Sequence, residues 1–190
     1  MNYQTALKQD ASLSFSHWLN MMALLAICGS LTMAFYWQIA FNELPCPLCQ
    51  LQRVGLMMAG IGFMLNVRFG PSAVHYAIIL ASALVGAATS MRQTLLHIAP
   101  GDAGYGTALF GMHFYTWGFV AFVVMMIFCC VMLCIDRNKM QAATGTALTG
   151  LAAIIIYFFF TLSAANVVSS VMVCKFGPCP DNPTEYIWKF

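Results

Sequence analysis

The chain has 190 residues, of which 61% are hydrophobic and only 7% are charged. A soluble domain carries about 25% charged residues, so this composition excludes an ordinary soluble protein and indicates an integral membrane protein. The net charge of +2 is too small to indicate a nucleic-acid partner.

Five apolar runs along the chain are long enough to cross a bilayer. A spanning helix needs about 20 apolar residues. The sequence predicts such helices over about residues 18–40, 48–67, 72–91, 115–135 and 146–168, followed by a tail at 169–190. Because there are several apolar runs and no β-barrel alternation, the expected fold is a single all-α membrane domain built as a helical bundle.

Five spans bring residues 41–47, the loop at 92–114 and the tail to the same side of the membrane. Basic residues do not identify that side, because each side carries four of them. Exposed, paired cysteines suit an oxidising compartment such as the bacterial periplasm. We therefore expect a multi-pass protein of the bacterial inner membrane, with the cysteine-bearing loops and the tail in the periplasm.

The eight cysteines fall into two classes. Four lie inside apolar runs, where a free cysteine behaves as a small hydrophobic residue: Cys28, Cys129, Cys130 and Cys134. The other four lie outside the runs, in the segments PCPLC and CKFGPC: Cys46, Cys49, Cys174 and Cys179. This second class contains the candidate functional cysteines.

The second span indicates what the first of these pairs can do. Residues 54–67 give only 14 uncharged positions, or about 21 Å of helix against a membrane core of about 30 Å. The helix is therefore expected to begin near Pro47 or Leu48. Cys49 then lies in the first turn, where free N–H groups and the helix dipole stabilise a thiolate. Arg53 follows four residues later on the same face, so the spacing predicts a reactive thiolate beside a fixed cation.

A CxxC motif also occurs in zinc sites and in structural disulfides. The four outer cysteines could form an all-thiolate zinc site, or each pair could brace a loop. The alternative function is therefore a non-enzymatic membrane subunit whose cysteine pairs bind metal or form structural disulfides. Redox chemistry is the favoured interpretation and no metal is expected, because a charge such as Arg53 within a membrane segment is costly and usually functional.

The segment PCPLCQLQR resembles the DsbB family of membrane disulfide-generating proteins, and RQTLLHIAP and GMHFYTW are similar to the same family in the same order. The resemblance implies a four-helix-bundle core, a bound quinone (ubiquinone or menaquinone) and a soluble thioredoxin-fold partner similar to DsbA. It also implies that Cys49 lies against the quinone, that Arg53 helps to bind it, and that Cys46 exchanges with a second cysteine pair. Gln93, near a position where the family often has histidine, and His97, one turn on, are further candidate quinone-binding residues.

Two features depart from the family pattern. The family carries its second cysteine pair between its third and fourth helices, but the loop at 92–114 contains no cysteine here. Cys174 and Cys179 instead follow an additional fifth transmembrane helix. We therefore expect electrons to pass from the soluble partner to the Cys174–Cys179 pair, then to Cys46–Cys49, and finally to the quinone. The expected function is that of a quinone-dependent oxidoreductase that generates disulfide bonds.

Overall fold

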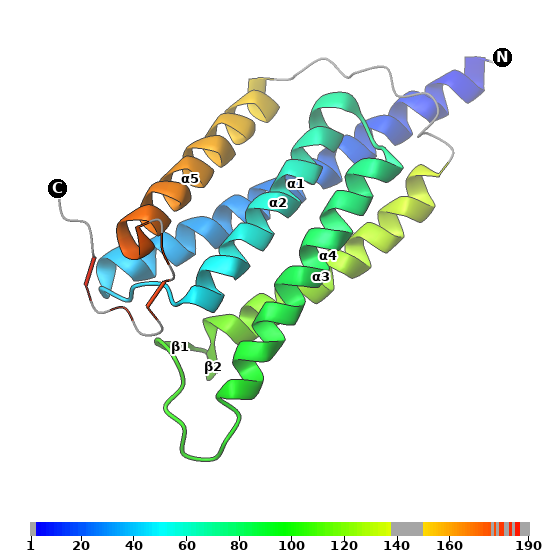
Figure 1. Ribbon diagram of the computed structural model, residues 1–190. Coiled ribbons are helices and arrows are strands. Elements are labelled where there is room, and N and C mark those ends of the chain that lie inside the picture. The colour runs from blue at the N-terminus through cyan, green and yellow to red at the C-terminus, as the bar shows by residue number, and fades with distance from the viewer. Residues whose placement is uncertain are drawn as a thin grey trace.

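The computed structural model describes residues 3–137, 150–175, 177, 179, 180, 183, 185 and 186, with side chains from residue 15 onward. Within this part, five helices and one short hairpin follow in chain order (Figure 1): α1 (Tyr3–Ala40), α2 (Pro47–Phe69), α3 (Ala73–Leu96), β1 (Ala108–Leu109), β2 (Met112–His113), α4 (Phe114–Asp136) and α5 (Gly150–Cys174). All five helices are long and apolar enough to cross a membrane. The predicted all-α membrane fold, including its fifth helix, is confirmed.

The helices form a four-helix group with α5 added on one side. α2 packs against α3, α3 packs against α4, and α1 packs against α2, whereas α5 contacts α1 and α2. The end of α1, the start of α2, the hairpin and the end of α5 gather at one end of the bundle (Figure 1). We call this the cysteine end, because both outer cysteine pairs lie there.

Two helices extend beyond their predicted ends. α3 continues to Leu96 and α5 continues to Cys174, whereas the apolar runs predicted ends near 91 and 168. Gln93 therefore lies within a helix, and Cys174 is the last residue of α5 and not part of the tail. The apolar run stops at the first polar side chains, but the backbone hydrogen bonds of a helix do not depend on side-chain polarity and continue past them.

The hydrophobic core takes side chains from all five helices. Its fully or nearly fully buried members are Met21, Leu24, Ile27, Cys28, Leu31, Ala59, Phe63, Val67, Tyr76, Ile79, Cys129, Met132, Ala152, Ile155 and Phe159. Close helix contact depends on small residues: a Cβ added at Gly86 would overlap the ring of Phe122. Of the four cysteines predicted to be packing residues, Cys28 and Cys129 are in this core, whereas Cys130 and Cys134 are exposed on α4.

A buried polar network joins the helices at the end of the bundle opposite the cysteine end. Asp136, at the end of α4, is fully buried. It accepts hydrogen bonds from the Ser16 hydroxyl and, at 2.8 Å, from the Tyr76 hydroxyl. Asn20 donates to Tyr76 Oη at 3.0 Å and accepts from Asn66 at 2.9 Å. The network therefore links side chains of α1, α2, α3 and α4.

Replacing Tyr76 with phenylalanine is expected to lower the free energy of unfolding by about 1–3 kcal/mol, because the buried Asp136 carboxylate loses a donor. Thermal unfolding of the purified protein in detergent measures this effect. Tyr157→Phe is the matched control, since Tyr157 is 74% exposed on α5. Equal unfolding midpoints for the two variants would show that the network contributes nothing to stability.

Candidate active site

The first cysteine pair forms a disulfide at the start of α2. Cys46 is the N-cap residue and Pro47 is the first helical residue, so the predicted helix start is confirmed. The Cα atoms of Cys46 and Cys49 are 5.0 Å apart. The Cys49 backbone N–H donates to Cys46 Sγ at 3.1 Å, which satisfies one of the free donors of the first turn. Cys46 is only 5% exposed, whereas Cys49 is partly exposed.

A buried amide from α3 contacts the same disulfide. Gln93 Nε2 donates towards Cys46 Sγ at 3.3 Å and towards Cys49 Sγ at 3.5 Å. Gln52 orients this amide, because its Nε2 donates to Gln93 Oε1 at 2.8 Å. Gln93 therefore supports the disulfide with a neutral donor that can also stabilise negative charge on either sulfur.

Arg53 is buried between α1 and α5. It is only 8% exposed, so its side chain is enclosed by the protein. Nη1 donates to Gln38 Oε1 at 2.7 Å and to Asn166 Oδ1 at 3.4 Å, and Nη2 donates to the Ala34 carbonyl at 3.1 Å. The guanidinium carbon also lies 5.4 Å from the centre of the Phe35 ring. These contacts fix the cation in one position.

The described partners of Arg53 are all neutral. Among the described residues, no carboxylate lies within ion-pair distance of Arg53. A guanidinium has five N–H donors, and the hydrogen bonds above use three of them. A buried cation without a carboxylate is costly, and it favours any ligand that carries or develops negative charge next to it.

Cys49 and Arg53 line one cavity of about 530 Å³ between α1, α2 and α4. Few Cα atoms of α1 and α4 lie close to one another, so the two backbones leave room for the cavity between them. The volume is in the range of small-molecule sites. The lining is mostly apolar: Ala26, Gly29, Ser30, Met33, Ala34, Trp37, Glu43, Leu44, Pro45, Cys49, Gln52, Arg53, Leu56, Tyr105, Gly106, Leu109, Phe114, Tyr115, Trp117, Gly118, Ala121 and Phe122.

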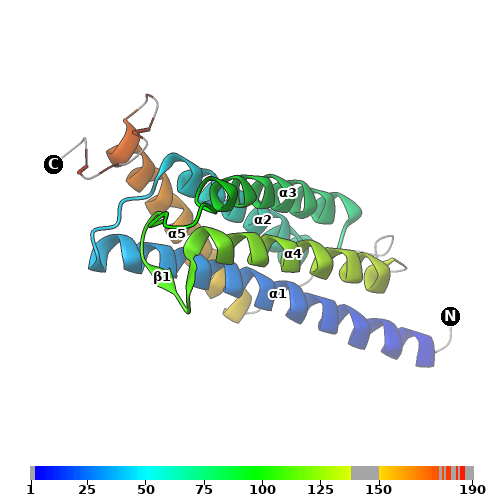
Figure 2. The ribbon, with the colours of Figure 1, turned by 90° about the horizontal axis from the view of Figure 1, so that it is seen from below.

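The segment between α3 and α4 covers this cavity at the cysteine end, where Figure 2 shows it crossing the ends of α1 and α4. Glu43 accepts hydrogen bonds from the backbone N–H of Thr107 at 3.0 Å and from the Thr107 hydroxyl. Tyr105 Oη donates to the Leu44 carbonyl at 2.5 Å. Burial, and then the charge of Glu43, raise the pKa of Tyr105, so its hydroxyl keeps its proton and remains a donor.

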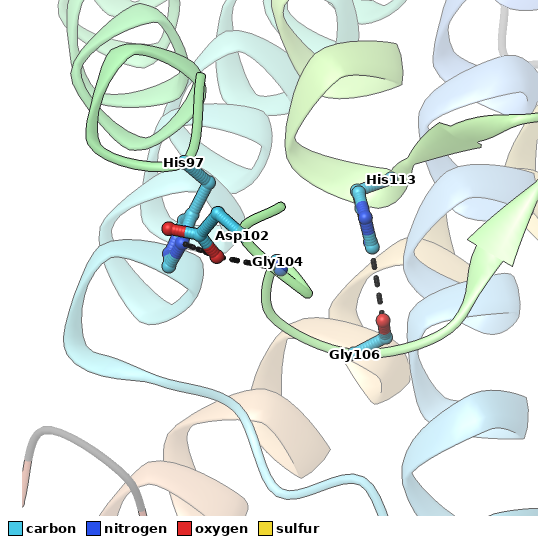
Figure 3. Close-up of polar contacts among 5 residues, drawn as sticks. All are labelled: His97, Asp102, Gly104, Gly106 and His113. Carbon is cyan, nitrogen blue, oxygen red and sulfur yellow. Dashed lines mark hydrogen bonds and ion pairs between the residues drawn. The ribbon is translucent and has the colours of Figure 1, made fainter. Parts of the chain in front are cut away.

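His97 takes part in the fold of this covering segment (Figure 3). Its Nδ1 lies 3.2 Å from Asp102 Oδ1, which also accepts the backbone N–H of Gly104 at 2.8 Å. His113 Nδ1 lies 3.1 Å from the Gly106 carbonyl. The Gly104 N–H and then His97 lower the pKa of Asp102. The carboxylate therefore stays ionised at neutral pH and takes up a proton only as the pH falls through that lowered pKa.

The structure does not place Gln93 and His97 in the wall of the cavity, where the family resemblance led us to expect them. Gln93 contacts the disulfide, and His97 pairs with Asp102 at the end of α3. The sequence shows both as polar residues near a helix end, but it does not show which way each side chain points. Their predicted contact with a quinone stays a prediction.

The second cysteine pair also forms a disulfide. The Cα atoms of Cys174 and Cys179 are 4.4 Å apart. Cys174 is 7% exposed, whereas Cys179 is partly exposed. Leu44, two residues before Cys46, packs with Val173 and Cys174 in a small buried cluster. The second pair therefore lies next to the segment that leads into the first. Among the described residues, no three His, Cys, Asp or Glu side chains gather as metal ligands would.

Comparison with known proteins supports the resemblance seen in the sequence. Residues 16–104 match the family model of the disulfide bond formation protein DsbB. A disulfide bond formation protein B from Marinobacter nauticus is 35% identical over 91 residues, which are 46% of this chain and 54% of that protein. One from Pseudomonas syringae pv. tomato is 42% identical over 74 residues, which are 37% of this chain and 43% of that protein. No solved structure matches the chain.

Over residues 16–104, just under half of its length, the chain is similar to the DsbB family. The family match spans α1, α2, α3 and the start of the segment that follows, and it includes Cys46, Cys49 and Arg53. α4, α5 and the second cysteine pair lie outside it. The chain spans about half the length of the curated DsbB relatives it matches.

The structure adds residues to this site that were not singled out from the sequence. Gln38 and Asn166 hold Arg53, and Gln52 orients Gln93. A signal was present, because Gln38 and Asn166 are uncharged polar residues within or beside apolar runs, where unsatisfied polar groups are costly. The sequence alone does not show that both contact the same arginine.

Proposed function

We propose that this protein is a membrane thiol:quinone oxidoreductase. It would reoxidise a soluble, DsbA-like dithiol protein in the periplasm and pass the electrons to a membrane quinone, so generating disulfide bonds. The cysteine end would face the periplasm. One observation carries the proposal: the Cys49 sulfur and the buried Arg53, which has no carboxylate partner among the described residues, line the same mostly apolar cavity.

The cavity suits a quinone. Aromatic side chains from α1 and α4, including Trp37, Phe114 and Phe122, can pack against a flat ring. Arg53 has two N–H donors that its described partners do not use, and these can bind a ring oxygen. A bound quinone would supply a two-electron, two-proton acceptor at this place.

The chain itself supplies the thiols and the positive charge. Once reduced, Cys46 and Cys49 hold two electrons and two protons as thiols, and they release both when their disulfide forms again. Arg53 and the Gln93 amide stabilise the Cys49 thiolate, the species that reacts in thiol exchange. The covering segment and the apolar lining keep water from this charge, which strengthens its interaction with Arg53.

The burial of Cys46 supports the second pair as the entry point for electrons. A soluble protein must reach a sulfur atom to attack it, and Cys46 is only 5% exposed behind the segment that packs on Val173 and Cys174. Cys179 is the more exposed sulfur of the second pair. A partner dithiol would attack Cys179, leave as a disulfide and deliver two thiols at Cys174 and Cys179.

Quinone reduction by a reduced thioredoxin-fold dithiol protein tests the proposal. The purified protein in detergent should catalyse loss of the quinone absorbance, with both ubiquinone and menaquinone analogues tried. The alternative is a non-enzymatic subunit whose cysteine pairs bind metal or brace loops. A preparation with stoichiometric zinc and no quinone reduction would support that alternative and refute the proposal.

Replacing Arg53 with glutamine is expected to raise the KM for quinone by roughly ten- to a hundredfold, because a buried charged hydrogen-bond donor is lost. Arg53→Lys should recover only part of the affinity, since a point charge lacks the planar fork of donors. Steady-state kinetics against quinone concentration measure both variants. Arg68→Gln is the control, because Arg68 lies on the exposed opposite end of α2. Equal KM values for Arg53→Gln and Arg68→Gln would show that Arg53 does not take part in quinone binding.

A further inference from the structure

The described part of the tail after α5 folds back against the site. Cys179 and Tyr186 pack on the small cluster formed by Leu44, Val173 and Cys174. The Cys174–Cys179 disulfide closes the chain immediately after α5. Tyr186 is therefore held near the last turn of α5 and the segment before α2, although it lies outside all five helices.

Tyr186 also contacts the partner of Arg53. Gln38 Nε2 donates to Tyr186 Oη at 2.9 Å and to Ser169 Oγ at 2.8 Å. Both hydrogens of the amide nitrogen are then used, and the amide oxygen faces the other way. That oxygen accepts from Arg53 Nη1 at 2.7 Å.

The direction of these hydrogen bonds is fixed by chemistry. Arginine can only donate, so the amide oxygen of Gln38 must face Arg53 and the amide nitrogen must face acceptors. Gln38 is 3% exposed, so water cannot easily replace an acceptor that is lost. Removing the Tyr186 hydroxyl leaves a buried N–H without that acceptor, which favours rotation of the amide away from the orientation that binds Arg53.

We propose that Tyr186 is a positioning residue, which holds Arg53 at the cavity through Gln38, and that the Cys174–Cys179 disulfide keeps Tyr186 in place. The proposal rests on the proposed function, since it assigns Arg53 to the binding of quinone. It gives the tail a second role besides thiol exchange. Whether the second cysteine pair is oxidised or reduced then affects the position of Arg53 at the cavity, even when no electron passes from that pair to the cavity.

The test compares Tyr186→Phe with Tyr157→Phe, a change of the same atoms at an exposed position of α5. Tyr186→Phe is expected to raise the KM for a short-chain quinone about three- to tenfold, the size of one hydrogen bond, with little change in kcat. A small dithiol serves as electron donor, so that docking of the protein partner does not enter the result. Tyr157→Phe should match the parent.

A second readout separates positioning from simple bracing of the tail. In a Cys46→Ala background, the alkylation of Cys49 is followed by mass spectrometry as a function of pH. Tyr186→Phe should move this profile to higher pH, because Arg53 stabilises the thiolate less well. Ser169→Ala, which removes the other acceptor of the same amide, should move it in the same direction. In a Gln38→Leu background, Tyr186→Phe should have no further effect.

The outcomes distinguish this inference from the proposed function. If Arg53→Gln raises the KM while Tyr186→Phe changes neither the KM nor the alkylation profile, the positioning role is refuted and the proposed function stands. If Arg53→Gln itself leaves the KM unchanged, the proposed function loses its anion-binding residue and this inference fails with it. A Tyr186→Phe effect that persists in full in the Gln38→Leu background would also refute the route through Gln38.

Discussion

Replacing Cys49 with serine is expected to abolish quinone reduction by both a dithiol protein and a small dithiol. Cys49 is the one cysteine among the described residues that lines the cavity, so no other described thiol there can replace it. Quinone reduction by the purified variant, followed by absorbance, gives the measurement. Cys134→Ser is the control, because Cys134 is a free, exposed cysteine on α4, and it should keep the parent rate.

The complementary variant shows the Cys49 thiol directly. Cys46→Ala cannot form the first disulfide, so Cys49 is left as a free thiol at the wall of the cavity. A thiolate that donates into a nearby quinone can give a visible absorption band. We expect such a band when quinone is added to Cys46→Ala and none for the double variant Cys46→Ala/Cys49→Ser. Quinone reduction by Cys49→Ser at the parent rate would show that Cys49 has been assigned wrongly.

The double variant Cys174→Ser/Cys179→Ser is expected to lose oxidation of the soluble partner. At a saturating quinone concentration, where a raised KM does not lower the rate, it should keep most of its quinone reduction with a small dithiol. A small molecule can reach Cys46–Cys49 past the tail, whereas a folded protein meets a sulfur that is 5% exposed. The two rates are measured side by side on the same preparation. Their ratio cancels any difference in the amount of folded protein.

A trapped intermediate would identify the cysteine that the partner attacks. In Cys174→Ser, a partner whose own second cysteine has been replaced should form a stable mixed disulfide with Cys179, the more exposed sulfur of the pair. Full partner oxidation by the double variant would instead make the tail disulfide a static brace, with direct attack on Cys46. Labelling of Cys179 by an impermeant reagent from the cytoplasmic side alone would overturn the proposed orientation.

The helices and the central geometry could be predicted because the membrane constrains them strongly. A backbone in lipid must satisfy its own hydrogen bonds, so each apolar run of sufficient length becomes a helix. The same length requirement predicted that α2 starts near Pro47 or Leu48, and therefore that Cys49 lies in its first turn; the observed start is Pro47. The four-residue spacing alone predicted that Arg53 lies on the same face of the helix as Cys49.

The surroundings of Arg53 could not be predicted in the same way. Gln38 and Asn166 reach it from α1 and α5, and the packing of one helix on another depends on side-chain shape along the whole bundle and not on local periodicity. The direction of His97 depends on how Asp102 and Gly104 close the following turn. A loop of this kind is fixed by a few polar contacts that have no periodic pattern in the sequence.

The neutral partners of Arg53 also bear on how the protein is made. During synthesis α1 and α2 enter the membrane first, and of the described hydrogen-bond partners of Arg53 only Gln38 and the Ala34 carbonyl are present at that stage. Asn166 arrives with α5, after the other four helices have been synthesised. An arginine in the membrane without its full set of partners is costly. Insertion of the last helix supplies the missing partner and should therefore stabilise the final packing of the bundle. The cavity would then acquire its fixed cation only at the end of assembly, so the proposed binding of quinone would have to wait until the second cysteine pair is also in place.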